Sequence, residues 1–304
     1  MSMVSCNSKQ DTLTLAFLGD IMLGIGVAVT LEEEDLKDVF EVILPQLQGA
    51  DLALANLESP FSRHPEDLAI SASQEDGCNL CADMRFADVL KYAGLDVVST
   101  ANNHTLDCRI ARQNDTRHTL DQAGITPIES GYDPIILTVG DKRLALLAFN
   151  DVLQGLDEDR VLQGIHLADT EADWVIVSIH WGLEYQAGAS PRQKRLAQNM
   201  ADAGADLIWG HHPHVLQPVE WLGRDGSRPP TLVMYSLGNA LFDQTVPRDA
   251  QRSALLMVAL GADGIRSVEA VPFVIQPGTY RLTLPDPEEK EMILQRLNYI
   301  GGLD

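Results

Sequence analysis

Ile208-Trp209-Gly210-His211-His212-Pro213-His214 is the stretch from which the fold and the function of this chain are best read. It follows an apolar, strand-like run over residues 205–209 and holds three of the eight histidines of the chain. Neutral imidazole is a common ligand for zinc and other transition metals. On an extended segment, His212 and His214 would point to the same side and could reach one metal cluster. The stretch therefore predicts a metal site at a strand exit, and the alternative is a surface turn with solvated histidines.

The composition describes an acidic globular protein. The 304 residues are 45% hydrophobic, which suits one large or two small domains with a sizeable core. The formal net charge is -22 and the pI is about 4.6. A binder of duplex nucleic acid or of anionic membranes needs a basic face, so we expect no nucleic-acid partner. No apolar run approaches the roughly 18 residues of a membrane helix, so we expect no membrane segment.

The first residues and the cysteines bear on the compartment. Residues 1–12 are polar and lack the apolar core of a signal peptide, which predicts a cytoplasmic protein. An extracytoplasmic domain with its signal or anchor removed is the alternative. Cys78 and Cys81 form a C-x-x-C pair, but a structural zinc site needs a second such pair. We expect ordinary loop thiols there, rather than zinc or redox chemistry.

Apolar runs and helical periodicity alternate along the chain, which favours an α/β layered fold. One domain is expected over residues 12–276, after a disordered segment at 1–11 and before a helical extension at 277–304 that packs on the same domain. Strands are expected at 12–18, 51–55, 96–100, 135–139, 144–149, 174–179, 205–209, 232–235, 254–260 and 265–275. Helices are expected at 32–47, 84–92, 111–123, 190–203 and 288–300.

The polar residues that carry chemistry lie where the predicted strands end. Five strand-like runs end in potential ligands, which are Asp20; Asn56 with Glu58; Asn103 with His104; His180; and His211, His212 and His214. Open α/β sheets bind ligands at the carboxyl ends of their strands. Packing alone does not explain five such exits, so the pattern predicts a dinuclear site. Two metals roughly 3.5–4 Å apart can activate a water, and a histidine that binds no metal can protonate the leaving group.

Six motifs, in order, resemble a known family. They are Gly19-Asp20-Ile21-Met22-Leu23, Asn56-Leu57-Glu58-Ser59-Pro60, Ala101-Asn102-Asn103-His104, His180-Trp181-Gly182-Leu183-Glu184-Tyr185, Gly210-His211-His212-Pro213-His214-Val215-Leu216-Gln217 and Tyr235-Ser236-Leu237-Gly238-Asn239. They resemble the bacterial CapA family of poly-γ-glutamate capsule biosynthesis, which is itself similar to calcineurin-like metallophosphoesterases. The resemblance covers residues 12–275.

The resemblance implies a four-layer αββα sandwich of two mixed β-sheets flanked by helices, with two divalent ions at one edge. Manganese, iron or zinc would suit the ligands. The implied roles are Asp20 on the first ion, Glu58 as the bridging carboxylate, Asn103 and His180 on the second ion, His212 and His214 on one ion each, and His104 as the leaving-group acid. Asp20 is thereby assigned to catalysis as well as to metal binding.

Two positions depart from the pattern of the family. Met22 stands where many metallophosphoesterases have a histidine, and a thioether is a poor ligand for hard or borderline metals. His211 is therefore a further candidate ligand, and otherwise one ion would be weakly held. After the Asn-His motif the family usually shows Asp-Tyr-Gly, whereas this chain has Asp107-Cys108-Arg109.

Several residues near the motifs are candidates for binding an anionic substrate, small or polymeric. Those we assign to substrate are Asn56, Glu184, Tyr185, Asn239 and, as the weakest, Arg192. Arg63, His64, Arg109 and Lys194 are further cations that could neutralise such a substrate, although a lone cation of this kind is more often a solvated surface charge. Trp181 and Trp209 are expected in the wall of the site. A homo-oligomer is compatible with this sequence.

Three functions are compatible with these residues. The first is a metal-dependent hydrolase of the phosphoesterase type that uses a metal-activated water and is associated with capsule biosynthesis. The second is a γ-glutamyl amide hydrolase or transferase acting on a polyglutamate-like substrate. The third is a non-catalytic, metal-bearing scaffold of a polymer synthesis complex.

Overall fold

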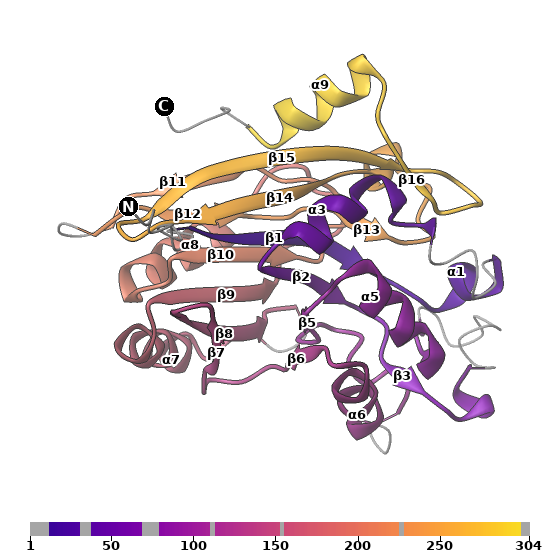
Figure 1. The fold of residues 1–304 in the computed structure, drawn as a ribbon, viewed down its shortest axis with the longest axis horizontal. Helices are drawn as coiled ribbons and strands as arrows, with labels where there is room; N and C mark the ends of the chain where they lie inside the picture. Colours follow the sequence, from indigo (N-terminus) through magenta and orange to yellow (C-terminus); the bar gives the residue numbers. More distant parts are fainter. Residues whose placement is uncertain are drawn as a thin grey trace, which may run out of the picture.

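The computed structural model describes residues 12–30, 38–68, 79–109, 113–152, 155–224 and 228–298. Its larger sheet is mixed and has the strand order β16-β15-β14-β1-β2-β5-β6, with β13 pairing on β1 (Figure 1). The parallel strands are β1 (Leu13–Ile21), β2 (Leu52–Leu57), β5 (Val97–Ser99), β6 (Thr126–Ile128) and β13 (Asn239–Leu241). The antiparallel strands are β14 (Arg252–Leu260), β15 (Ile265–Ile275) and β16 (Leu282–Thr283).

The second sheet is also mixed and has the order β11-β12-β10-β9-β8-β7. Four parallel strands form its centre, namely β8 (Lys142–Asn150), β9 (Trp174–His180), β10 (Leu207–His211) and β12 (Thr231–Met234). The edges are the antiparallel strands β7 (Ile135–Val139) and β11 (Val219–Leu222). The predicted hairpin of β7 and β8 is confirmed. A central strand buried on both faces reads as a continuous apolar run, as β9 does.

The core lies between the two sheets. Leu15, Phe17 and Leu54 of the first sheet and Leu146 and Trp209 of the second belong to one buried cluster. The Phe17 and Trp209 rings meet edge to face, with centroids 5.5 Å apart. Trp209 also donates Nε1–H to the carbonyl of Leu18 at 2.9 Å, so a buried hydrogen bond joins the sheets close to the ends of β1 and β10.

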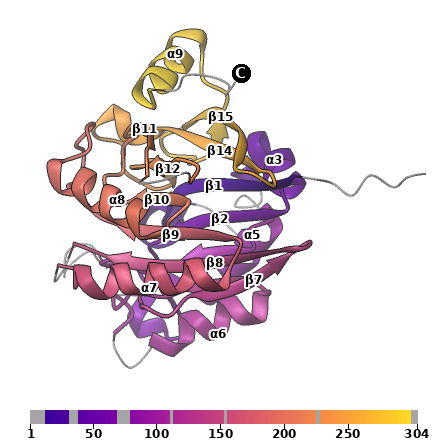
Figure 2. The same cartoon turned by 90° about the vertical axis from the view of Figure 1, so that its left-hand side faces the viewer.

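Helices cover the outer faces of both sheets (Figure 2). On the first sheet lie α1 (Ile25–Thr30), α3 (Leu44–Gly49), α5 (Ala87–Ala93) and α6 (Gln113–Ala123). On the second lie α7 (Glu158–Glu171) and α8 (Pro191–Ala203), and α8 begins with the predicted Ser190 cap and Pro191. The four-layer αββα prediction is confirmed. The last helix, α9 (Pro287–Arg296), adds Ile293 to the central cluster.

One predicted helix is wrong. The spacing over 32–47 predicts a single helix, but residues 31–37 lie outside the described residues, and the rest forms a 3-10 turn at Glu41–Ile43 followed by α3. Pro45 opens α3, because proline fits the first turn of a helix and disrupts its interior. The apolar face is nonetheless correct, since Val39, Phe40, Ile43 and Leu47 are buried.

The expectation of ordinary thiols is also wrong for Cys81, which forms a disulfide with Cys108. The two residues are 27 positions apart, so no local spacing indicated the pair. Cys78 and the segment 1–11 lie outside the described residues. Among the described helices, none has both the length and the apolar character needed to cross a bilayer.

Candidate metal centre

The predicted ligands come from strand ends of both sheets. Asp20 lies near the end of β1, Glu58 directly after β2, and Asn103 in the turn after β5, all in the first sheet. His180 ends β9 and His211 ends β10 in the second sheet, where the two residues are register partners. The strand ends meet because the sheets are stacked with these exits at the same edge.

The two carboxylates are fully buried and share a donor. Asn56 donates Nδ2–H to Asp20 Oδ1 at 2.8 Å and to Glu58 Oε1 at 3.3 Å. Its own Oδ1 accepts from Asn102 Nδ2 at 3.4 Å, and Asn102 also donates to the carbonyl of Leu57 at 2.8 Å. Asn56, a predicted substrate contact, therefore lies behind the carboxylates and orients them.

The imidazoles surround these carboxylates. His180 Nε2 lies 2.7 Å from Asn103 Oδ1 and 3.9 Å from Glu58 Oε1. His214 Nδ1 lies 3.2 Å from Asp20 Oδ2, and His214 Nε2 lies 3.9 Å from Glu58 Oε2. The His212 ring lies beside that of His180, with the two ring centroids 4.8 Å apart. All six predicted metal ligands are thus gathered at one edge of the sandwich.

The backbone that carries His212 and His214 is not extended as expected. Their φ angles are 94° and 56°, in the left-handed region that non-glycine residues rarely adopt. Such conformations cost on the order of 1–3 kcal/mol each and persist where the surroundings over-determine them, often at functional sites. The turn still brings the two rings together, with centroids 5.9 Å apart.

Asn239 holds His214 from the other side. Its Oδ1 lies 2.9 Å from His214 Nδ1, and its Nδ2 donates to the carbonyl of Ala250 at 3.0 Å. The side chain is fully buried, so Asn239 contacts a candidate ligand rather than the solvent-facing side of the site. The position of Asn239 depends on the absence of a side chain at Gly19, because a Cβ on Gly19 would lie 1.9 Å from the carbonyl oxygen of Gly238. That close approach lets β13 pair with β1, with Asn239 opposite Asp20.

Several buried polar atoms at this edge have no hydrogen-bond partner. They are Glu58 Oε2, His180 Nδ1, both ring nitrogens of His211 and His212 Nδ1. Buried polar atoms are nearly always paired, so a cluster of unpaired carboxylate and imidazole atoms is the donor set a cation would satisfy. Two groups offer ligand atoms within 4.8 Å of one another: Asp20, Glu58 and His180, and Glu184, His212 and His214.

The side chain of Met22 belongs to the buried core on the outer side of the first sheet. Met22 is fully buried, and its Sδ accepts from the amide of Gly24 at 3.1 Å. His211 Nδ1 lies 3.5 Å from Asp20 Oδ1. His211 is therefore a second imidazole beside Asp20, slightly farther away than His214 Nδ1 at 3.2 Å.

The proton affinities reflect burial opposed by neighbouring charge. Burial raises the pKa of Asp20, but the adjacent imidazoles of His211 and His214, at 3.5 Å and 3.2 Å, outweigh it and hold that pKa well below its usual value. Burial raises the pKa of Glu58 to about 7, against the opposing charge of His214. Burial lowers the pKa of His214, but Glu58 and Asp20 outweigh it and raise that pKa to about 9.

The other imidazoles at this edge are biased towards the neutral form. Burial, and then the charge of His212, lower the pKa of His180 well below its usual value. Burial and His214 lower the pKa of His212 to about 4, and burial lowers the pKa of His211. Neutral imidazole is the form that binds metals.

His104 is held differently from the other histidines. Its Nδ1 lies 2.9 Å from Asp107 Oδ2, and the residue is only half-buried. Burial lowers the pKa of His104, but the hydrogen bond to Asp107 and the charge of Glu58 outweigh it, so the pKa is raised. A histidine whose pKa is raised and whose ring is oriented by a carboxylate suits general-acid chemistry.

Of the remaining predicted substrate residues, two lie beside the site and one is paired with a carboxylate. Glu184 and Tyr185 are exposed beside the site, with the Tyr185 amide donating to the Pro213 carbonyl at 2.8 Å and its ring 6.3 Å from that of His214. Arg192 instead binds Asp151 through Nε at 2.7 Å and Nη2 at 2.6 Å, so its charge is already matched. Trp181 and Trp209 are fully buried wall residues, as predicted.

The further cations are paired away from the ligands. Arg109 binds Asp67 at 3.2 Å, Lys194 binds Glu220 at 3.4 Å, and Arg63 and His64 lie 3.9 Å from Asp115. Sequence reasoning missed the positioning roles of Asn102 and Asp107. The role of Asp107 could have been inferred from its position three residues after His104, because in a turn its carboxylate can contact the His104 ring.

Comparisons with known proteins agree with this architecture. Residues 14–244 match the family described as "Bacterial capsule synthesis protein PGA_cap". The "PGA biosynthesis protein CapA" of Bacillus subtilis (strain 168) is 30% identical over 311 residues, covering 95% of this chain and 77% of the relative. The "Capsule biosynthesis protein CapA" of Bacillus anthracis is 32% identical over 294 residues, covering 89% and 69%.

One curated relative and one solved structure are similar to this chain at lower identity. A "Probable polyglutamine synthesis accessory protein" of Mycobacterium tuberculosis is 24% identical, covering 69% of this chain and 70% of the relative. The crystal structure of a hypothetical protein from Thermus thermophilus superposes with a TM-score of 0.55 at 17% identity, covering 86% of this chain and 99% of that one, which supports the fold alone. The family match, which covers most of the chain, and the two CapA relatives show that this protein belongs to the bacterial capsule synthesis family PGA_cap, the CapA family.

Proposed function

We propose that this chain is a metal-dependent hydrolase of the metallophosphoesterase type that serves in capsule or poly-γ-glutamate biosynthesis. The observation that carries the proposal is the set of buried carboxylate and imidazole atoms without hydrogen-bond partners, drawn from both sheets to one edge. The biosynthetic setting comes from the names of the relatives.

The residues present fit two divalent ions. Asp20 and His211 would hold one ion, Asn103 and His180 the other, and Glu58 would lie between them. His212 and His214 would complete the two sets, with Glu184 beside them. Bound ions would supply a nucleophilic water of lowered pKa and would neutralise anionic substrate oxygens.

The chain's own residues supply orientation and proton transfer. Asn56 fixes Asp20 and Glu58, and Asn239 fixes His214, so the ligand set is pre-organised. His104, oriented by Asp107, would donate its proton to the leaving-group oxygen and later regain one from water.

The experiment uses protein purified without chelator and then supplied with manganese, iron or zinc. Aryl phosphates and phosphodiesters are assayed with Asp20→Ala and His104→Ala. The controls are Asp141→Ala and His166→Ala, because both side chains are exposed and far from the strand exits in sequence. We expect loss of turnover in the site variants alone, and equal turnover in all four would refute the proposal.

A second function, cleavage or transfer of γ-glutamyl amide bonds, is favoured by the name "PGA biosynthesis protein CapA" of the Bacillus subtilis relative. The same ligand set could serve an amide, since ions also polarise carbonyl oxygens. Poly-γ-glutamate is therefore incubated in parallel and its chain length is followed. Metal binding with neither activity would favour the scaffold function.

A further inference from the structure

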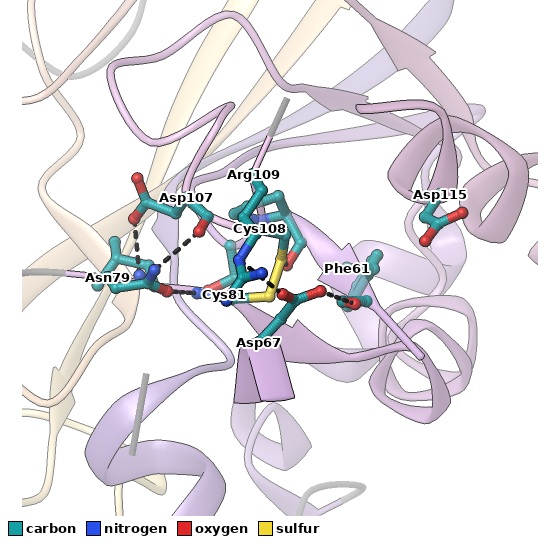
Figure 3. Close-up of a disulfide and its surroundings, with 12 residues drawn as sticks. Phe61, Asp67, Asn79, Cys81, Asp107, Cys108, Arg109 and Asp115 are labelled. Atoms are coloured by element: carbon teal, nitrogen blue, oxygen red, sulfur yellow. Dashed lines mark hydrogen bonds and ion pairs between the residues drawn. A yellow bond between two sulfur atoms is a disulfide. The ribbon is translucent and has the colours of Figure 1, made fainter. Parts of the chain in front are cut away.

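The disulfide between Cys81 and Cys108 lies beside Asn79, Asp107 and Arg109 (Figure 3). Cys108 belongs to the same turn as His104. Both cysteines are buried, with 2% of their surface exposed. Cys81 directly precedes the short strand β4 (Ala82–Asp83), which pairs with β3 (Phe61–Ser62) beyond Glu58. Cys108 follows Asp107. The disulfide therefore joins the segment at 79–83 to the turn at 104–109.

Asp107 is the residue that these two segments share. Its Oδ2 lies 2.9 Å from His104 Nδ1 and accepts the amide of Leu80 at 2.7 Å. Its backbone carbonyl accepts from Asn79 Nδ2 at 2.7 Å. The covalent link thus stands one residue beyond Leu80 on one segment and one residue beyond Asp107 on the other.

A second anchor follows directly in the sequence. Arg109 Nε lies 3.2 Å from Asp67 Oδ1, and the Asp67 side chain is fully buried and accepts from Ser62 Oγ at 2.8 Å. Arg109 has a φ of 71°, a conformation that non-glycine residues rarely adopt. Cys108 and Arg109 are the two positions at which this turn departs from the family's pattern. Cys108 connects the turn to Cys81, and Arg109 connects it to Asp67.

We propose that the Cys81–Cys108 disulfide positions His104, through Asp107 and Leu80, so that the proton-donating function of the site depends on the oxidation state of this cysteine pair. The inference rests on the proposed function for the role of His104, but its structural part does not. A cross-link that served only global stability would not need to lie next to both Asp107 and Leu80, the residue whose amide the Asp107 carboxylate accepts. Asp107 and the two cysteines are positioning residues.

The redox chemistry is thiol–disulfide exchange with a small-molecule disulfide. One cysteine thiolate attacks the oxidant and releases one thiol, and the second cysteine then displaces the other thiol to form the Sγ–Sγ bond. Two protons and two electrons leave the protein and reduce the oxidant to two thiols. In the reduced form, the carbonyl oxygen of Pro60, 3.2 Å from Cys108 Sγ, is an acceptor for the thiol proton. Such a disulfide persists in an oxidising compartment, which favours the extracytoplasmic alternative.

The first test is independent of activity. Peptide mapping after treatment with oxidised glutathione should find Cys81 linked to Cys108. Hydrogen exchange is then compared among the oxidised protein, the protein reduced with dithiothreitol, and the C81A/C108A variant. C6A/C78A is the control that removes two thiols but keeps the pair. We expect exchange at 79–83 and 104–109 to accelerate at least about tenfold without the disulfide, while β9 and β10 stay unchanged.

The second test uses leaving-group dependence, which a merely structural role would not change. A general acid matters for phenyl phosphate and little for nitrophenyl phosphate, whose leaving group needs no proton. Without the disulfide, turnover of phenyl phosphate should fall about tenfold to a hundredfold and that of nitrophenyl phosphate by less than about threefold. In a His104→Ala background, the same change should cause no further loss.

Specific outcomes would overturn the inference. Free Cys81 and Cys108 after oxidation, or unchanged exchange at both segments, would remove the positioning role. Equal losses on both substrates that add to those of His104→Ala would reduce the disulfide to a general stabiliser. If no form of the protein hydrolyses either ester, the proposed function fails, and the exchange measurement still decides whether the pair positions the turn.

Discussion

Replacing Asn56 by alanine should separate the support of the ligands from the ligands themselves. The amide donates to Asp20 at 2.8 Å and to Glu58 at 3.3 Å, and all three side chains are fully buried. A hydrogen bond to a charged group contributes about 1.5–3 kcal/mol, and the longer bond contributes less. The Asn102 amide would lose one acceptor but keep the Leu57 carbonyl. We therefore expect the metal-free variant to lose about 2–4 kcal/mol of unfolding free energy.

Metal binding should suffer as well, because Asn56 orients two candidate ligands. Loss of such an outer partner typically lowers metal affinity 10–100-fold. Chemical denaturation of metal-free protein gives the first quantity, and calorimetric titration with manganese or zinc gives the second. Asn114→Ala, at an exposed position of α6, is the control. If Asn56→Ala matches the parent protein in both measurements, the carboxylates are not held in the way the hydrogen bonds indicate.

Three further predictions follow from the same geometry. Glu184→Gln should reduce the number of bound ions from two towards one, because Glu184 is the exposed member of the group with His212 and His214. Elemental analysis after dialysis measures this number. An unchanged number of ions would exclude Glu184 as a ligand. In metal-free protein, the pKa values of about 7 for Glu58 and about 9 for His214 lie above their ordinary values of 4.5 and 6.5. Glu58 therefore contributes stability that is lost as pH rises from 4.5 to about 7, and His214 contributes stability that is lost as pH rises from 6.5 to about 9. Above about pH 7.5 the histidines of lowered pKa are neutral in both the folded and the unfolded state, so His214 accounts for the loss there. Ions need the deprotonated ligands, so the difference in melting temperature with and without metal should widen over the same range, and a constant difference would contradict the assignment. Removing the Cys81–Cys108 link, with its separation of 27 residues, should lower the unfolding free energy by about 3.5 kcal/mol on the chain-entropy account, and denaturation of C81A/C108A against C6A/C78A measures it.

The gathering of the candidate ligands at one sheet edge could be predicted from the sequence because these residues follow strand ends. An apolar run such as 174–179 identifies a buried strand, and the first polar residue after it must emerge at the sheet edge. Asp20, Glu58, Asn103 and His180 were found in this way. The family resemblance added the two-sheet sandwich, which periodicity alone does not distinguish from a single open sheet.

The rest depended on contacts between distant residues. The pairing of β13 with β1, which places Asn239 opposite Asp20, needs the close approach of Gly19 and Gly238. The left-handed φ angles of His212 and His214 are imposed by their surroundings, since neither residue favours them. The Cys81–Cys108 pair likewise follows from the fold, and no sequence pattern joins the two cysteines.

Charge gives a final argument about what the site can bind. The chain carries a net charge of -22, and the described cations Arg109, Arg192 and Lys194 are paired with carboxylates. None of these three cations is therefore available to an anionic substrate, which would meet the carboxylates of Asp20, Glu58 and Glu184. Two divalent ions would reverse the local charge, because bound cations are the largest charges in such a site. Binding of inorganic phosphate should thus require metal, and equal binding to chelator-treated protein would show that another surface attracts the anion.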